Sequence, residues 1–390
     1  MINVFQPSLG EEELAAVAEV FASNWLGHGP RTQRFEAEFA AHLGVPAENV
    51  VFINSATAGL FLATELLGLG PGDDVVLPSM SFVAAANAVA ATGARPVFCD
   101  VDPRTLNPTA DHVARALTPR TRAVLVLHYG GHPGDIEAIA ALCRHHGVRL
   151  VEDAACAVAS DAGGRKAGTF GDLAMWSFDS MKVLVTGDGG MLHVRDPELA
   201  RTARTLAYHG LRQSSGFAAA KVSARWWDLD VQGFGRRIIG NDLTAAIGSV
   251  QLRRLPSFTA RRRAVAAAYD RLLAGTEGIT TPPPPPPGHT TTPYFYWVQL
   301  DAAVRDRVAA DLLDHGVYTT LRYPPLHQVP AYRATTPHLP GPDLPGTDLA
   351  AATTLLLPLH QALDDTDVHT VATALTKAVA HHRTTPPDRP

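Results

Sequence analysis

The feature that most constrains this chain is a regular alternation of short β-rich runs with longer stretches whose apolar residues recur at helical spacing. The runs predicted as strands are residues 50–53, 74–77, 96–100, 123–127, 149–152, 173–178 and 190–194, and the intervening helices include 57–66, 83–91 and 136–145. Strands that alternate with helices of this length require crossover connections. The pattern therefore predicts an α/β protein in which a mostly parallel, buried sheet lies between helices.

The last third of the chain predicts a second, smaller α+β unit. The helical stretch 242–273 contains Pro256, which should break or kink it, and we place the domain boundary near that residue. The proline run 282–287 predicts a stiff, extended connector. Further helices are expected at 11–24, 32–43, 302–315 and 366–382, and a further strand at 294–300. The expected organisation is a large domain over 1–250, a small domain over 251–382 and a disordered tail over 383–390.

Charge and cysteine content argue against several classes of protein. The 390 residues carry 33 Lys+Arg against 38 Asp+Glu, a formal charge of -5, without the basic stripe that nucleic acids require. Cys99, Cys143 and Cys156 are far apart and lack a CxxC pair, so neither disulfides nor zinc are suggested and a reducing cytoplasm fits best. The chain shows no secretory signal pattern and no run of about 18 apolar residues, so we expect neither secretion nor membrane spanning.

Lys182 is the lysine best suited to chemistry. It closes a strand-to-loop segment that begins at Ser177, and a glycine cluster follows at residues 187–190. Partial burial is expected to lower the pKa of Lys182, and the glycines let the backbone pass close to a cofactor, so the segment suits a Schiff base. An ordinary surface lysine before a hairpin turn explains this segment equally well.

Three other segments with candidate functional residues also follow predicted strands. Asp153 leaves a buried strand at its carboxyl end, where it could pair with a protonated ring nitrogen or simply cap a helix. Ser55 and Thr57 stand between a strand and a helix, where free amides would face a phosphate, although N-capping is the commoner use of such residues. Phe82 could stack on an aromatic cofactor or belong to the core.

The order of these segments along the chain carries the argument. It runs phosphate loop, stacking ring, acidic partner and lysine, each at a strand end. His128, Tyr129 and His132 also follow a strand, but loop histidines are more often structural or solvated, so we leave these residues out of the site. No residue set suggests a metal. A dinucleotide cofactor would need a GxGxxG motif opening a βαβ unit, which the sequence lacks.

From Val4 to Leu375 the chain resembles the fold-type I aminotransferases of the DegT/DnrJ/EryC1/StrS family, which act on sugars. Besides the segments above, the resemblance depends on the loop 25–30, the stretch 96–102 and the motif 323–327. It implies a large domain with a mostly parallel seven-stranded sheet, a smaller α+β domain and pyridoxal 5'-phosphate as cofactor. It also implies a homodimer with shared active sites.

The resemblance assigns roles to individual residues. Lys182 corresponds to the Schiff-base lysine, Asp153 to the partner of the pyridine nitrogen and Phe82 to the stacking ring. The phosphate cradle corresponds to Ala56, Thr57 and Ser177, beside the candidate Ser55. The sugar pocket corresponds to Trp25, Leu26, Tyr323 and His327, partly from the second subunit.

Several residues depart from the family pattern. Asp179 stands where the family commonly has His, and Asp188 where it commonly has Glu. Cys156 replaces a His or Gln that often touches the cofactor, and a thiol is a poorer hydrogen-bond partner. The family's cross-dimer phosphate Asn is also missing. We hypothesise that Arg237 or Asn241 substitutes for it, because the Arg237 fork would suit a phosphate.

The function implied by the resemblance is a transamination. The expected donor is glutamate or glutamine, and the expected acceptor is a nucleotide-linked keto-deoxysugar such as a dTDP-4-keto-6-deoxyhexose, used in amino-sugar or antibiotic biosynthesis. Because pocket shape sets the position and epimer of the amine, a 3-keto sugar or a keto-cyclitol stays open. An alternative hypothesis from another functional class is a catalytically inactive homologue that binds sugars or acts in regulation. Lysine, acid and phosphate loop retained together argue against that hypothesis.

Overall fold

A computed structural model describes residues 1–212, 225, 227–334 and 343–384. Its main sheet contains β1 (Val50–Ile53), β2 (Asp74–Pro78), β3 (Arg95–Cys99), β4 (Thr121–Leu127), β5 (Arg149–Asp153), β8 (Leu173–Ser177) and β9 (Gly190–Val194). The strand order is β1-β9-β8-β5-β4-β2-β3. Only β9 runs against its neighbours in this sheet, so the predicted mostly parallel seven-stranded sheet is confirmed.

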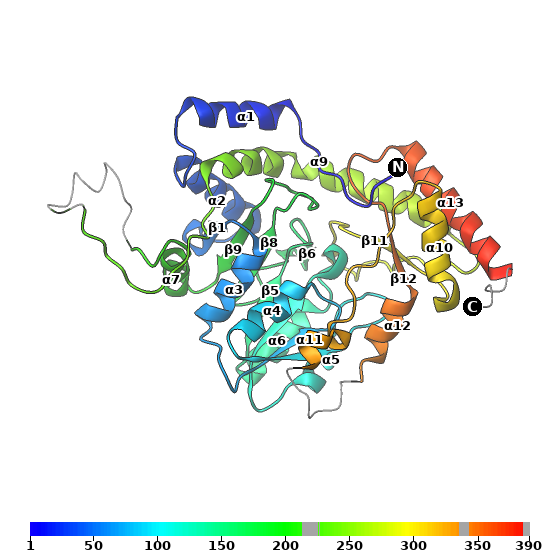
Figure 1. Cartoon of the computed structure of the whole chain (residues 1–390), viewed down its shortest axis with the longest axis horizontal. Helices are drawn as coiled ribbons and strands as arrows, with labels where there is room; N and C mark the ends of the chain where they lie inside the picture. Colours follow the sequence, from blue (N-terminus) through cyan, green and yellow to red (C-terminus); the bar gives the residue numbers. More distant parts are fainter. Residues whose placement is uncertain (213–224, 226, 335–342, 385–390) are drawn as a thin grey trace.

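Helices cover both faces of this sheet, as Figure 1 shows. The helices of the first 207 residues are α1 (Glu11–Ala22), α2 (Pro30–Leu43), α3 (Ala56–Leu66), α4 (Val83–Ala91), α5 (Ala110–Ala116), α6 (Ile136–His146) and α7 (Pro197–Ala207). Short elements complete this part: the 3-10 turns η1 (Ala47–Asn49) and η2 (Tyr129–Gly131), and the strands β6 (Asp161–Ala162) and β7 (Arg165–Lys166). β6 pairs with β7 on one side and with β10 (His289–Thr290) on the other.

Alternate residues of the strands pack into different cores. In β1, Val50 and Phe52 join the cluster that includes Phe35 of α2, whereas Val51 and Ile53 join the cluster formed with α3, α4 and α7. Successive side chains of a strand point to opposite faces, so a strand covered on both faces must be apolar throughout. This explains why the strands could be recognised as unbroken apolar runs.

The last third of the chain builds a second cluster of elements. It contains α9 (Asp242–Leu273), β11 (Tyr296–Gln299), α10 (Ala302–Asp314), η3 (Leu326–Gln328), α11 (Pro330–Arg333), α12 (Pro345–Thr353), β12 (Thr354–Leu357) and α13 (Asp365–Thr384). β11 and β12 pair antiparallel, and one face of the pair, with Tyr296, Val298, Leu355 and Leu357, packs with α10, α13 and the second half of α9 in a separate core. Trp297 and Leu356 on the other face join the cluster of the main sheet. The predicted small α+β unit therefore has a separate apolar core.

Two sequence expectations need correction here. Of the break or kink predicted at Pro256, the break does not occur, because helix α9 continues from Asp242 to Leu273 and its packing on α1, α2 and α13 offsets the lost hydrogen bond. The kink stays a prediction. The predicted boundary at residue 250 thus lies inside a helix, and the division into two domains stays a prediction. The last helix reaches Thr384, two residues into the expected tail, and residues 385–390 lie outside the described residues.

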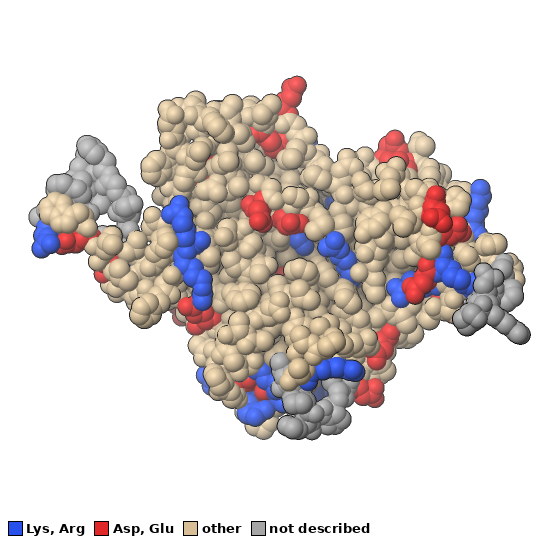
Figure 2. Space-filling view, in the orientation of Figure 1, with Lys and Arg blue, Asp and Glu red and all other residues tan. Residues whose placement is uncertain are grey.

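The surface and the helices carry little that is unusual. On the face in Figure 2, Lys and Arg are interspersed with Asp and Glu in small groups. Within the described ranges, every helix is too short or too polar to cross a bilayer.

Candidate active site

The carboxyl edge of the main sheet brings most of the predicted site residues together. β5 and β8 are adjacent and parallel, so Asp153 and Ser177 leave the sheet on the same edge. β9 runs the other way and begins at Gly190, which pairs with Ser177 on one side and with Ile53 on the other. The same edge therefore holds the acid, the start of the α3 loop and the segment that leads to Lys182.

Lys182 lies half-buried above an aromatic ring, with its Nζ atom 4.6 Å from the centre of the Tyr294 ring. Burial acts to lower the pKa of Lys182, but acidic neighbours act in the opposite direction and raise the pKa well above its usual value. These neighbours are Cys156, Tyr294, Tyr323 and Asp153. The lowered pKa expected from burial alone is therefore wrong for the lysine without cofactor.

Asp153 is a buried acid, with 3% of its surface exposed. Its Oδ1 atom accepts a hydrogen bond from the Ala155 amide at 3.0 Å. Burial raises the pKa of Asp153, although the Ala155 amide and the charge of Lys182 oppose this effect. The neighbouring Glu152 is bonded to His128 Nε2 at 2.8 Å, and both side chains are fully buried. His128, which the sequence analysis left out of the site, therefore has a structural contact.

The loop before α3 has the geometry of an anion cradle. Ser55 is the N-cap of α3, and its hydroxyl accepts from the Ala58 amide at 3.1 Å. Ala56 and Thr57 form the first turn, where backbone amides lack partners within the helix. A Cβ atom at Gly190 would lie 2.6 Å from the Ala56 nitrogen. Only glycine lets β9 pack this closely against the loop.

Phe82 lies at the predicted place for a stacking ring, just before α4, and 43% of its surface is exposed. Its ring centre is 5.3 Å from that of Tyr323, which in turn packs edge-on against Tyr129. Tyr323 is buried and also acts on Lys182 and Cys156. Phe82 and Tyr323 are far apart in the sequence, yet both lie beside the lysine site in the structure.

Both ring nitrogens of His327 have partners within the protein. Its Nδ1 atom is 2.7 Å from Ser79 Oγ, and its Nε2 atom is 3.2 Å from Asp348 Oδ1. The Leu326 amide also donates to the Ser79 carbonyl. These contacts fix η3 on the loop that carries Phe82, so His327 supports the site. Its contact with substrate stays a prediction.

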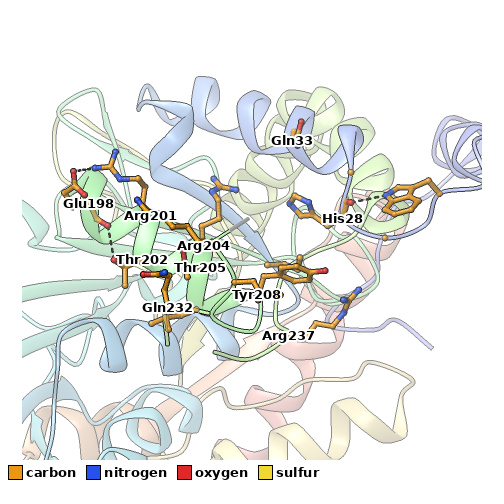
Figure 3. Close-up of a pocket in the computed structure, with 17 residues that line it drawn as sticks. His28, Gln33, Glu198, Arg201, Thr202, Arg204, Thr205, Tyr208, Gln232 and Arg237 are labelled. Carbon is orange, nitrogen blue, oxygen red and sulfur yellow. Dashed lines mark hydrogen bonds and ion pairs between the residues drawn. The ribbon is translucent and has the colours of Figure 1, made fainter. Parts of the chain in front are cut away.

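Trp25 and Arg237 line a cavity of about 1170 Å³ that Lys182 does not line. Figure 3 shows this cavity with Arg237 beside Tyr208, whose ring centre is 5.6 Å from the guanidinium carbon. The Trp25 indole donates to the His28 carbonyl at 3.0 Å. The predicted site residues therefore fall into two groups in one chain.

The segment after Arg237 connects the two groups. The Ile238 carbonyl accepts from the Asn54 amide at 2.7 Å, directly before the phosphate loop. Asn241 caps α9 and accepts from the Thr244 amide at 3.0 Å, which occupies its side-chain oxygen. Arg237 is thus the freer of the two candidates for the missing phosphate contact. Leu26 is about half exposed.

Known proteins are similar to this chain in sequence and in fold over nearly their whole length. Residues 7–376 match the DegT/DnrJ/EryC1/StrS aminotransferase family. The chain belongs to this family. The dTDP-4-dehydro-2,3,6-trideoxy-D-glucose 4-aminotransferase of Saccharopolyspora spinosa is 64% identical over 382 residues, which cover 98% of each chain.

Solved structures of family members agree with this assignment. The aminotransferase TlmJ from Streptoalloteichus hindustanus is 62% identical, with a TM-score of 0.92 over 98% of this chain and 99% of that chain. DesV from S. venezuelae is 35% identical, with a TM-score of 0.84 over 94% of each chain. The protein is an aminotransferase of the DegT/DnrJ/EryC1/StrS family.

Two residues beside the lysine of this aminotransferase carry no local sequence signal. Tyr294 opens a predicted strand and reads as core, yet its ring lies under Lys182. Arg322 precedes Tyr323, and its charge acts on Tyr294, Cys156 and other buried groups of the site. Both come from the last third of the chain, so only the tertiary structure brings them to the lysine.

Proposed function

We propose that this aminotransferase uses pyridoxal 5'-phosphate to move an amino group from glutamate or glutamine to a nucleotide-linked keto-deoxysugar. The observation that carries the proposal is the position of Lys182 beside Asp153 at one edge of the sheet, with the α3 loop at the same edge. The relative from S. spinosa supports a dTDP-linked 4-keto sugar as the acceptor.

The residues present fit pyridoxal phosphate. Asp153 is a buried acid that would meet a protonated ring nitrogen, and the first-turn amides of α3 suit a phosphate. Among the residues that the structure describes, the buried hydroxyls of Tyr129 and Tyr294 have no hydrogen-bond partner, and their rings adjoin Tyr323 and Lys182. Such orphaned donors are expected where a polar group is to bind. The cofactor supplies an electron sink that stabilises negative charge on the substrate carbon.

The side chains would divide the remaining work. Lys182 would hold the cofactor and, once displaced by the amino donor, would move a proton at the reacting carbon. Asp153 would keep the ring nitrogen protonated, since a nearby carboxylate favours the cationic form. Phe82 would cover one face of the ring, with Tyr323 setting its position.

Cys156 enters this scheme as a neutral group. Burial raises the pKa of its thiol to about 11, so the sulfur is uncharged at physiological pH. Its proposed contact with the cofactor is therefore a packing contact rather than a charged hydrogen bond. The three cysteines are unpaired and buried, which supports a reducing compartment such as the cytoplasm.

We further propose a homodimer whose subunits complete each other's sites. Large apolar residues are exposed on α1, on the loop after it and on the segment 231–234, whose Gln232 lines the cavity of Figure 3. They are Leu14, Phe21, Trp25, Leu26, Val231 and Phe234. Exposed apolar surface of this kind is typical of association sites. In this proposal Trp25, Leu26 and Arg237 serve the site of the other subunit.

The test combines trapping with turnover. Borohydride treatment of the purified holoenzyme should fix pyridoxal phosphate on Lys182, identified by peptide mass spectrometry. With glutamate or glutamine as donor, a panel of dTDP-linked 4-keto and 3-keto sugars should give an aminated product, with the position of the amine determined by NMR. Lys182→Ala should abolish the borohydride label at this position and lower turnover by on the order of 100-fold to 10,000-fold. Label on another lysine, or no amination of any sugar, would overturn the proposal.

A further inference from the structure

Arg322 is a cation beside the lysine site, and it has no carboxylate partner in the part of the chain that the structure describes. Its side chain is half-buried, and its guanidinium carbon lies 5.0 Å from the centre of the Phe5 ring. Its Nη2 atom lies 3.5 Å from the sulfur of Met181, the residue before Lys182. Within the described ranges, no acidic oxygen comes within 4.0 Å of this guanidinium. A thioether is a weak acceptor, so this contact leaves most of the hydrogen-bonding capacity of Arg322 unused.

A second arginine near the site, Arg262, differs from Arg322 because its guanidinium has several protein hydrogen-bond acceptors. Arg262 is buried and also lacks a carboxylate in the described part of the chain. However, it donates to the carbonyls of Pro293 and Tyr294 and to the side chain of Gln361. Arg262 is therefore structural, whereas Arg322 keeps a fork of donors for a ligand.

The surroundings of Arg322 point towards the reacting centre. The Phe5 ring, over which the Arg322 guanidinium lies, stacks on Tyr294 with ring centres 5.5 Å apart. The Tyr294 ring in turn lies 4.6 Å from Lys182 Nζ. The charge of Arg322 also acts on Tyr129 and Cys156, both buried in the same cluster. The cation thus lies on the wall of the lysine site, near the place of covalent chemistry.

We propose that Arg322 binds the α-carboxylate of the amino donor. This inference rests on the proposed transamination. The donor's carboxylate is bonded to the carbon whose amine reacts, so it must lie within a few ångströms of the lysine site. Arginine presents two parallel N–H donors that match a carboxylate. The keto sugar is uncharged at its reacting carbonyl, and its diphosphate is separated from that carbon by the sugar ring.

The experiment separates the two half-reactions. Holoenzyme with Arg322→Ala, Arg322→Lys or Arg322→Gln is mixed with glutamate alone, and conversion of the cofactor to its aminated form is followed by absorbance. The aminated enzyme is then mixed with the keto sugar alone. Arg322→Ala should raise the glutamate concentration for half-maximal conversion at least tenfold. It should change the corresponding sugar concentration less than threefold, and Arg322→Lys should be intermediate.

A binding measurement and a control complete the design. The dissociation constant of 2-methylglutamate, which has no α-proton and therefore cannot complete the half-reaction, should rise at least tenfold in Arg322→Ala. Arg263→Gln removes a charge from an exposed arginine of α9 that donates to the Thr291 carbonyl, and should leave every value unchanged. If Arg322→Ala does not fold, the Gln and Lys variants carry the test.

Two results would overturn the assignment. Loss confined to the sugar half-reaction would place Arg322 at the nucleotide diphosphate. Equal loss in both halves, with unchanged affinity for 2-methylglutamate, would make it structural. Failure of the proposed function is distinguishable, because the wild-type enzyme would then convert no amino donor at all.

Discussion

Asp153 ends a strand that is buried on both faces, and burying its ionised carboxylate there lowers the stability of the folded protein. Burial raises the pKa of Asp153 despite the Ala155 amide and the Lys182 charge. A raised pKa in the folded state means that the protonated form is the better tolerated one. The ionised form therefore destabilises the protein without cofactor, and a cationic ring nitrogen would relieve that cost.

We predict opposite effects of Asp153→Asn on stability and on activity. The cofactor-free variant should be more stable than wild type at pH 8, where ionised Asp153 carries its full cost. The difference should shrink as pH falls through the raised folded-state pKa towards the unfolded value of about 3.9. Turnover should fall roughly 10-fold to 100-fold, because a charge-assisted hydrogen bond is lost.

Denaturant unfolding between pH 4 and pH 8, paired with turnover assays, checks both effects. A variant less stable than wild type at pH 8 would show that Asp153 is stabilised by its surroundings, contrary to the argument. Asp161→Asn is a suitable control, because Asp161 pairs with Lys166 away from the lysine site.

Lys182 gives a second prediction at this scale. Since its pKa is raised in the free protein, the amine is protonated at neutral pH and cannot attack an aldehyde. Attachment of pyridoxal phosphate to the cofactor-free protein should therefore become faster as pH rises from 6 to 9, by roughly tenfold per pH unit. Stopped-flow absorbance measures this rate, with Lys182→Ala as the control. A rate independent of pH would contradict the raised pKa.

At the scale of elements, the contact between β9 and the α3 loop decides the geometry of the phosphate cradle. Gly190→Ala would bring a Cβ atom within 2.6–2.8 Å of backbone atoms of Ala56, Ser55 and Trp176, which cannot move aside independently. We expect a loss of about 1–3 kcal/mol in unfolding free energy and weaker binding of pyridoxal phosphate.

Gly70→Ala is the matched control for this substitution. A Cβ atom at Gly70 would meet nothing within 4 Å, so its effect should stay within about 0.5 kcal/mol. Denaturant unfolding and cofactor titration of both variants test the idea. Equal affinities for the cofactor would show that the loop does not depend on the close approach of β9.

Helix α9 shows where local rules fail at this scale. Pro256 removes one hydrogen bond, but Leu255 and Phe258 on either side of it are buried. Burying such side chains is worth about 1.5–3 kcal/mol each, comparable to the cost of a helix-interior proline. Local sequence signals a break there, and packing overrides it.

At the scale of the whole molecule, the shared-site proposal predicts complementation. Lys182→Ala and Arg237→Ala should each be poorly active alone. A mixed dimer would contain one site with both original residues, so dissociated and reassociated mixtures should recover roughly a quarter of wild-type activity. Arg236→Ala, which breaks only a pair with Glu65, should keep its activity. Absence of recovery in verified mixed dimers would place Arg237 in the site of its own chain.

The sequence alone predicted the alternation of strands and helices and placed Lys182, Asp153, Phe82 and the α3 loop at strand ends, whereas the roles of these residues came from the resemblance to the family. Each of these is a local signal, because a strand buried on both faces must be apolar and its carboxyl end is where ligands bind. Short elements without periodicity, such as α5 and the pair β6–β7, gave no such signal and were not predicted.

Only the tertiary structure decided what surrounds the lysine. Tyr294 and Arg322 lie more than a hundred residues after Lys182, and neither was a candidate from sequence, although the family resemblance placed Tyr323, the neighbour of Arg322, at the sugar pocket. The direction of the Lys182 pKa also depends on such neighbours, since burial alone would lower it. Local pattern determines strands and their ends, whereas the charges and rings that meet at those ends come from chain segments brought together by folding.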